Sequence, residues 1–137
     1  MILADAGPLV ALFDRTDAAH GGCVETLMKI DEPIATTVPV LTEAFHLLGS
    51  TGAGASALMN FITEGGLQVL YLDDDTIVRA FELMVQYADA PMDFADASLV
   101  ALAESLSLRK VFTIDRNDFT TYRIRRGHRY IAFDVME

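Results

Sequence analysis

The 137-residue sequence has a single cysteine, Cys23, and three histidines. One thiol cannot form a disulfide within the chain, and no Cys/His cluster suggests a structural zinc site. No apolar run reaches the roughly 18 residues of a membrane-spanning helix. The first five residues also lack the basic start of a signal peptide. We therefore expect a cytoplasmic protein that does not enter a membrane and that keeps its thiol reduced.

Basic residues are scarce over most of the chain. Residues 1–108 hold three basic residues against sixteen acidic ones, a balance of −13. Residues 109–137 hold seven basic residues against four acidic ones, a balance of +3. The overall charge of −10 does not suit a nucleic-acid-binding protein, but the positive C-terminal segment could contact a phosphate backbone. A solvated basic surface is the other explanation for such a run.

With 52% apolar and 22% charged residues, the chain has the composition of a globular protein. It contains no internal repeat, low-complexity segment or linker, and we expect residues 1–137 to form one domain. Apolar periodicity and turn residues predict helices from Pro8 and at residues 18–30, 40–48, 55–64, 73–88 and 94–106. Short strands are predicted at residues 1–5, 33–38, 67–72, 111–114 and 130–133. This alternation predicts an α/β fold whose central, mostly parallel sheet is flanked by helices.

The predicted helix at residues 94–106 carries an acid on its apolar face. Asp96 lies on the same stripe as Leu99, Val100 and Ala103, which should face the core. An ionised carboxylate there is costly unless it is hydrogen-bonded, paired or metal-bound. The local alternative is helix capping, with Asp93 at the N-cap and Asp96 in the first turn, where the helix dipole favours negative charge.

Three other acids lie at or shortly after the ends of predicted strands. Asp5 and Asp115 lie at strand carboxyl ends, and Glu43 lies early in the helix that follows the second strand. In open α/β sheets, ligands bind beyond the carboxyl ends of the strands. If Asp5, Glu43, Asp96 and Asp115 converge there, they form an all-oxygen site suited to magnesium or manganese.

Each of the four acids lies in a recognisable motif. The motifs are I-L-A-D-A-G-P-L-V-A-L around Asp5, V-L-T-E-A around Glu43, D-F-A-D-A-S-L-V-A-L-A around Asp96, and V-F-T-I-D-R-N-D-F around Asp115. Taken together, they resemble the PIN-domain ribonucleases, most closely the VapC-type toxins of toxin–antitoxin pairs. The resemblance covers essentially the whole chain.

The resemblance implies a PIN-like three-layer sandwich and a metal-dependent endoribonuclease that hydrolyses RNA phosphodiester bonds. It implies that Asp5, Glu43, Asp96 and Asp115 are catalytic and hold one or two Mg²⁺ or Mn²⁺ ions. The family pattern assigns supporting positions to Asp93, Thr113 and Asp118, and we expect RNA contacts from Arg116, Arg123, Arg125 and Arg126. A homodimer and a VapB-type antitoxin are the implied protein partners.

One residue departs from the family pattern: Ala6 stands where relatives often carry Ser or Thr. Its methyl group cannot supply a hydroxyl contact to the site. Two other functions remain open, namely a PIN-fold RNA-processing nuclease that is not a toxin and a catalytically silent domain that binds RNA or protein. Retention of all four acids speaks against the silent domain.

Two further α/β classes lack a required residue. A phosphoaspartate enzyme of the haloacid-dehalogenase type needs a second aspartate two residues after the nucleophile, where this chain has Gly7. A receiver domain of two-component signalling needs a late lysine at a strand end. The only lysines are Lys29 and Lys110, and Lys110 precedes its predicted strand.

Overall fold

A computed structural model describes residues 1–136, which form seven strands and seven helices. In chain order these are β1 (Ile2–Ala4), α1 (Ala6–Phe13), α2 (His20–Lys29), β2 (Ile34–Thr37), α3 (Val38–Leu48), α4 (Ala53–Thr63), β3 (Gln68–Leu70), α5 (Asp74–Gln86), α6 (Phe94–Leu106), β4 (Lys110–Phe112), α7 (Arg116–Thr121), β5 (Arg123–Arg126), β6 (Arg129–Ala132) and β7 (Asp134–Met136). No helix among these residues is both long and apolar enough to span a bilayer.

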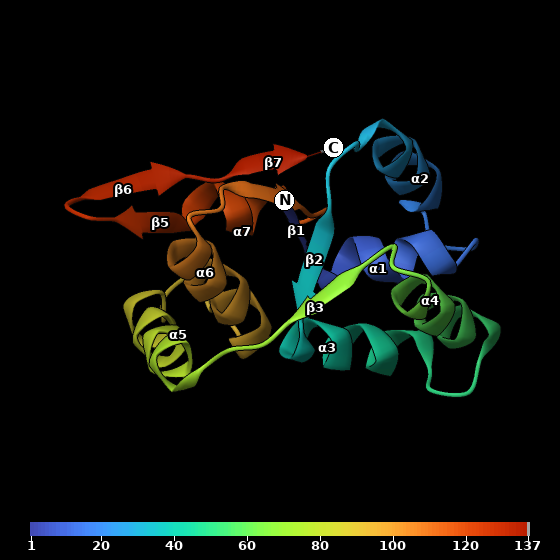
Figure 1. Cartoon of the computed structure of the whole chain (residues 1–137), viewed down its shortest axis with the longest axis horizontal. Coiled ribbons are helices and arrows are strands. Elements are labelled where there is room, and N and C mark those ends of the chain that lie inside the picture. The colour runs from blue at the N-terminus through green and yellow to red at the C-terminus, as the bar shows by residue number, and fades with distance from the viewer. Residues whose placement is uncertain (137) are drawn as a thin grey trace.

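The central sheet has five strands in the order β3-β2-β1-β4-β7, and every neighbouring pair is parallel. Strands β1 and β2 are buried along their whole length, as expected for a parallel sheet covered on both faces. Helices α1, α2 and α4 lie on one side of the sheet, and α5 and α6 lie on the other (Figure 1). The predicted three-layer α/β fold is therefore confirmed.

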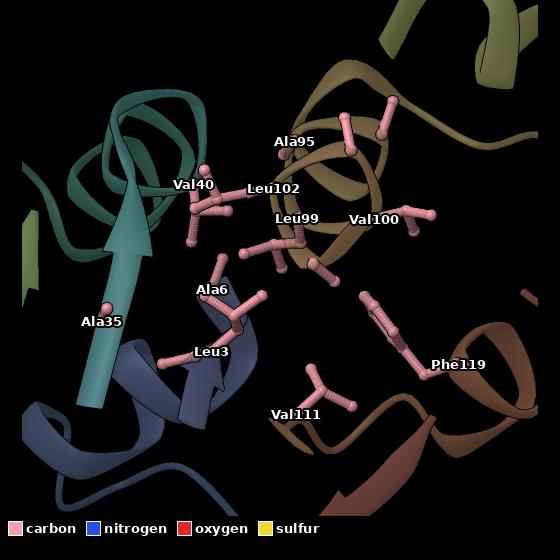
Figure 2. Packing of buried hydrophobic residues seen from close by; sticks show 14 of the residues in the cluster. Leu3, Ala6, Ala35, Val40, Ala95, Leu99, Val100, Leu102, Val111 and Phe119 are labelled. Carbon is pink, nitrogen blue, oxygen red and sulfur yellow. The ribbon is translucent and has the colours of Figure 1, made fainter. Parts of the chain in front are cut away.

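The hydrophobic core lies between the sheet and α6. Leu3 of β1, Leu99 of α6 and Val111 of β4 are completely buried and project into the same space (Figure 2). Helix α6 carries small buried residues on several sides, so its backbone can approach both the sheet and α5 closely. This packing fixes the start of α6, and therefore Asp96, relative to the sheet.

The C-terminal part of the chain differs from the sequence prediction. The predicted strand at residues 130–133 corresponds to β6, which pairs with β5 in a separate antiparallel hairpin and does not join the central sheet. The edge of the central sheet is completed by β7, which follows immediately. Apolar alternation predicts an extended segment, but it does not identify the partner strand.

Most other element boundaries differ from the prediction by one or two residues. Strand β4 ends at Phe112, where its pairing with β1 and β7 ends, so residues 113 and 114 are not part of the strand. Helix α4 starts at Ala53, two residues before the helix predicted at residues 55–64. A Cβ atom at Gly54 would lie 2.7 Å from the Phe13 carbonyl oxygen, so glycine allows α4 to pack against the end of α1.

Candidate active site

Asp5 connects β1 to α1 and is the most buried of the candidate acids, with 8% of its surface exposed. It is the N-cap of α1, and its Oδ1 accepts a hydrogen bond of 2.8 Å from the Ala6 backbone N–H. Its Oδ2 accepts a hydrogen bond of 3.0 Å from the Thr113 hydroxyl. Both oxygens are therefore held at the carboxyl ends of β1 and β4. Burial raises the pKa of Asp5, and the charges of Asp93 and Asp115 add to this effect.

Asp96 lies in the first turn of α6, on the face that packs toward the core. Asp93 caps the helix by accepting a hydrogen bond from the Asp96 backbone N–H at 2.8 Å. The capping interpretation is thus correct for Asp93. The Asp96 carboxylate has a different contact: its Oδ2 accepts a hydrogen bond of 2.9 Å from the Tyr122 hydroxyl. Burial raises the pKa of Asp96 to about 7, with further contributions from the charges of Asp5 and Asp93.

Glu43 reaches the site from α3. The Thr37 side chain caps this helix through the Val40 backbone N–H, and Pro39 lies in its first turn. The Thr37 hydroxyl is also hydrogen-bonded, at 2.7 Å, to the Ser98 hydroxyl of α6 inside the core. This contact fixes the starts of α3 and α6 relative to each other, so Glu43 and Asp96 face a common space. Burial is the main cause of the raised pKa of Glu43, and the charges of Asp93 and Asp5 raise it further.

Asp115 and Asp118 lie in the segment that follows β4. Asp115 is the N-cap of α7 and accepts a hydrogen bond of 3.3 Å from the Asp118 backbone N–H. The Asp115 backbone N–H donates in turn to the Thr113 hydroxyl at 3.0 Å. Thr113 therefore bridges Asp5 and Asp115. Burial raises the pKa of Asp118 to about 6, with further contributions from its contact with Asp115 and from that residue's charge.

These carboxylates line one pocket of about 260 Å³ at the carboxyl ends of the central strands. All four acids predicted as catalytic contribute to it, together with two predicted as supporting. The six acids are Asp5, Glu43, Asp93, Asp96, Asp115 and Asp118. Burial, and secondarily the like charges in this confined space, disfavour ionisation, which explains the raised pKa values of Asp5, Glu43, Asp96 and Asp118.

The chemistry of this donor set fits a hard divalent cation, because carboxylate oxygens are the ligands that Mg²⁺ and Mn²⁺ prefer. A cation would also offset the mutual repulsion that, after burial, contributes to these raised pKa values. Within residues 1–136, however, no three His, Cys, Asp or Glu side chains are arranged to hold an ion as they stand.

The predicted RNA-contacting arginines do not line the acidic pocket. Arg116 borders a neighbouring pocket of about 290 Å³ that shares Ile114 with the acidic one. Arg123, Arg125 and Arg126 lie on β5, and the latter two are exposed. The Arg123 guanidinium donates to backbone carbonyls, including that of Thr120 at 2.6 Å. Any RNA contact by β5 would thus lie outside the pocket.

The fold and the carboxylate pocket define a class of protein that the sequence comparison also identifies. Residues 2–124 match the PIN domain family, and the chain belongs to that family. It is 25% identical to ribonuclease VapC26 of Mycobacterium tuberculosis over 132 residues, which are 94% of this chain and 97% of that protein.

Solved structures show the same fold. The structure of M. tuberculosis VapC20, described as a toxin that cleaves the sarcin–ricin loop, superposes with a TM-score of 0.78 at 21% identity. That match covers 86% of this chain and 92% of VapC20. A toxin–antitoxin complex from Klebsiella pneumoniae gives a TM-score of 0.65 at 18% identity, over 88% of this chain and 92% of that one.

Sequence reasoning did not find Tyr122. This side chain is completely buried, and its hydroxyl contacts a candidate metal ligand 26 residues earlier in the chain. Its position between α7 and β5 carries no motif. A tyrosine in an otherwise core-like position next to an arginine-rich strand was the available signal, because a buried phenol hydroxyl requires a hydrogen-bond partner.

Proposed function

We propose that this protein is a metal-dependent endoribonuclease and the toxin of a toxin–antitoxin pair. The observation that carries this proposal is the pocket of six carboxylates, several with raised pKa values, at the carboxyl ends of a parallel sheet. Membership in the PIN domain family and the similarity to a ribonuclease that spans nearly the whole chain support it. The toxin assignment draws on the same relative and on the two structural neighbours.

In this proposal, Asp5, Glu43, Asp96 and Asp115 hold Mg²⁺ or Mn²⁺, with Asp118 beside them. A bound divalent ion would polarise the scissile phosphate and lower the pKa of the attacking water. The chain's own contribution is to fix the carboxylates. The Ala6 backbone N–H and the Thr113 hydroxyl hold Asp5, and the Tyr122 hydroxyl holds Asp96. Asp93 fixes the backbone at the start of α6.

The proposed macromolecular partners are RNA, a second copy of the chain and a VapB-type antitoxin. The arginines of β5 would contact the RNA backbone that the acidic remainder of the chain repels. The antitoxin would cover the nuclease site until it is removed. The nearest competing function is a PIN-fold RNA-processing nuclease that is not a toxin. Co-expression with the product of the adjacent reading frame separates them: an antitoxin suppresses growth arrest caused by the toxin.

The direct test of the chemistry is the Asp96→Asn variant in an RNA cleavage assay with Mg²⁺ or Mn²⁺. Loss of one ligand and one negative charge should reduce cleavage about 10³-fold or more. The fold should persist, because the amide retains an oxygen that can accept from Tyr122. Unchanged metal-dependent cleavage by the folded variant would overturn the assignment of Asp96. A wild-type protein that binds RNA but does not cut it with either metal would favour the catalytically silent domain.

A further inference from the structure

Tyr122 lies in the link between α7 and β5 and is completely buried. Its ring makes edge-on contacts with the rings of Tyr87, at 5.2 Å, and Phe119, at 5.3 Å between centroids. Its backbone N–H donates to the Asp118 carbonyl at 2.9 Å and ends α7. The side chain is thus held from several directions and has little freedom to turn.

The hydroxyl of this buried ring is directed at a carboxylate of the acidic pocket. It donates to Asp96 Oδ2 at 2.9 Å, within the range of an O–H···O hydrogen bond. A phenylalanine would fill the same aromatic cluster without requiring a polar partner. The hydroxyl therefore adds a specific contact to Asp96 that hydrophobic packing alone does not need.

Asp96 is consequently fixed at two points, one three residues away and one 26 residues away in the chain. Asp93 holds its backbone N–H, and Tyr122 holds one oxygen of its carboxylate. The phenol takes one lone pair of Oδ2, which leaves Oδ1 and the second lone pair of Oδ2 for an ion. Partners of this kind orient metal-binding side chains, and their removal typically weakens metal affinity or activity by about 10- to 100-fold.

We infer that the Tyr122 hydroxyl is a positioning group that holds the Asp96 carboxylate in the orientation needed to bind a divalent cation. The inference rests on the proposed function, since it requires Asp96 to be a metal ligand. Tyr122 itself does not touch the ion or the substrate. Its role is to reduce the number of carboxylate orientations that a cation must select among.

Tyr87 provides a matched control within the same aromatic cluster. It is a partly buried tyrosine whose hydroxyl accepts a hydrogen bond from the Arg123 backbone N–H at 3.0 Å. The Tyr87→Phe and Tyr122→Phe variants each remove one hydroxyl and retain the ring. Only Tyr122→Phe removes a contact to Asp96.

The experiment measures Mn²⁺ binding by titration calorimetry for the wild type, Tyr122→Phe, Tyr87→Phe and Asp96→Asn, with melting temperatures taken in chelator. Tyr122→Phe should raise the dissociation constant about tenfold or more, and Tyr87→Phe should stay within about twofold of the wild type. The Mn²⁺ concentration for half-maximal RNA cleavage should rise in the same ratio for Tyr122→Phe.

The possible failures can be told apart. If the wild type binds Mn²⁺ and cuts RNA but Tyr122→Phe binds Mn²⁺ equally well, the hydroxyl only satisfies a buried group and this inference is wrong. If the wild type does not bind Mn²⁺, and if it cleaves RNA no faster than Asp96→Asn, the proposed function fails instead.

Should Tyr122→Phe not fold, the wild type itself can be studied by NMR after tyrosine labelling. The Tyr122 hydroxyl proton should stay protected from solvent exchange when Mg²⁺ is added. Disappearance of that protection on Mg²⁺ binding would also overturn the inference.

Discussion

Asp5 and Asp96 each depend on a hydrogen bond from outside their own motif. Thr113 is a clear case: its hydroxyl donates to Asp5 Oδ2 and accepts from the Asp115 backbone N–H. The family resemblance assigns Thr113 only a supporting position. In the structure its hydroxyl links Asp5 to Asp115. A buried carboxylate such as Asp5 is tolerated because donors of this kind offset part of its loss of hydration.

The raised pKa values predict how the stability of the metal-free protein depends on pH. An acid whose pKa is higher in the folded state holds its proton after the unfolded chain has lost it, so it lowers stability above the unfolded pKa. For Asp96, with a folded pKa of about 7, the loss accumulates from about pH 4 to pH 7 and then levels off. Metal-free wild type should therefore melt higher at pH 5 than at pH 8.

The size of this effect is limited by the partial exposure of Asp96. We expect about 1–2 kcal/mol between pH 5 and pH 8 after allowing for solvent screening. Asp96→Asn should melt higher than the wild type at pH 8 and show a flatter profile. Differential scanning calorimetry in chelator measures both. A wild-type profile that rises toward pH 8 would mean that neither burial nor neighbouring charge raises the pKa of Asp96 in the folded state.

At the scale of elements, the ion pair between Arg79 and Glu104 links helices α5 and α6, and a hydrogen bond to Glu104 adds strand β5. Arg79 of α5 donates from Nε to Glu104 of α6 at 2.7 Å, and Glu104 also accepts from the Arg125 backbone N–H of β5 at 2.9 Å. The Arg79 and Glu104 side chains are only 14% and 9% exposed. Glu104 thus attaches the arginine-bearing hairpin to the layer formed by α5 and α6.

Glu104→Gln should therefore destabilise the protein by about 3 kcal/mol, because it leaves a largely buried arginine with only the exposed Glu82 as its counter-charge. Glu82→Gln is the matched control, since Glu82 pairs with the same arginine at 3.1 Å but is 55% exposed. Its replacement should change stability by less than about 1 kcal/mol. Urea unfolding of both variants gives the comparison. Equal effects would show that burial does not determine the strength of this ion pair.

The hairpin itself leads to a prediction about RNA. Replacing the exposed Arg125 and Arg126 with glutamine should weaken RNA binding and flatten its salt dependence. The log–log slope should fall by about 0.7 for each phosphate that the variant no longer neutralises. The control is the Arg15→Gln, Lys29→Gln pair, which removes the same charge from exposed positions elsewhere. If both pairs leave the slope unchanged, β5 is a solvated basic surface or contacts a protein partner.

For the whole molecule, the exposed apolar surface favours association. Helix α5 leaves Val78, Phe81 and Val85 exposed at 54%, 53% and 78%, spaced so that they lie along one face. Exposed apolar side chains that gather on one face commonly mark an interface, and we predict that a second copy covers this one.

Sedimentation should show a dimer at micromolar concentrations, and Phe81→Glu should convert it to a monomer. Met28→Glu is the control, because Met28 is an 81% exposed apolar residue on α2. A wild-type monomer would contradict the predicted homodimer. A Phe81→Glu dimer would instead place the interface elsewhere.

The sequence by itself determined the features that depend on neighbouring residues. The periodicity of residues 94–106 predicts α6 with the observed bounds, and Asp93 marks its start because a cap acts within one helical turn. The alternation of strands and helices predicts a parallel sheet, which in turn places Asp5 and the region of Asp115 at one edge.

Only the tertiary structure decided how distant segments combine. The hydroxyl bond from Tyr122 to Asp96 joins residues 26 positions apart, and no local pattern encodes it. The tertiary structure also decided that β6 pairs with β5 and β7 with β4, because each short extended segment can pair with several strands. The raised pKa values have the same origin: they depend on burial and on charges that only folding brings together.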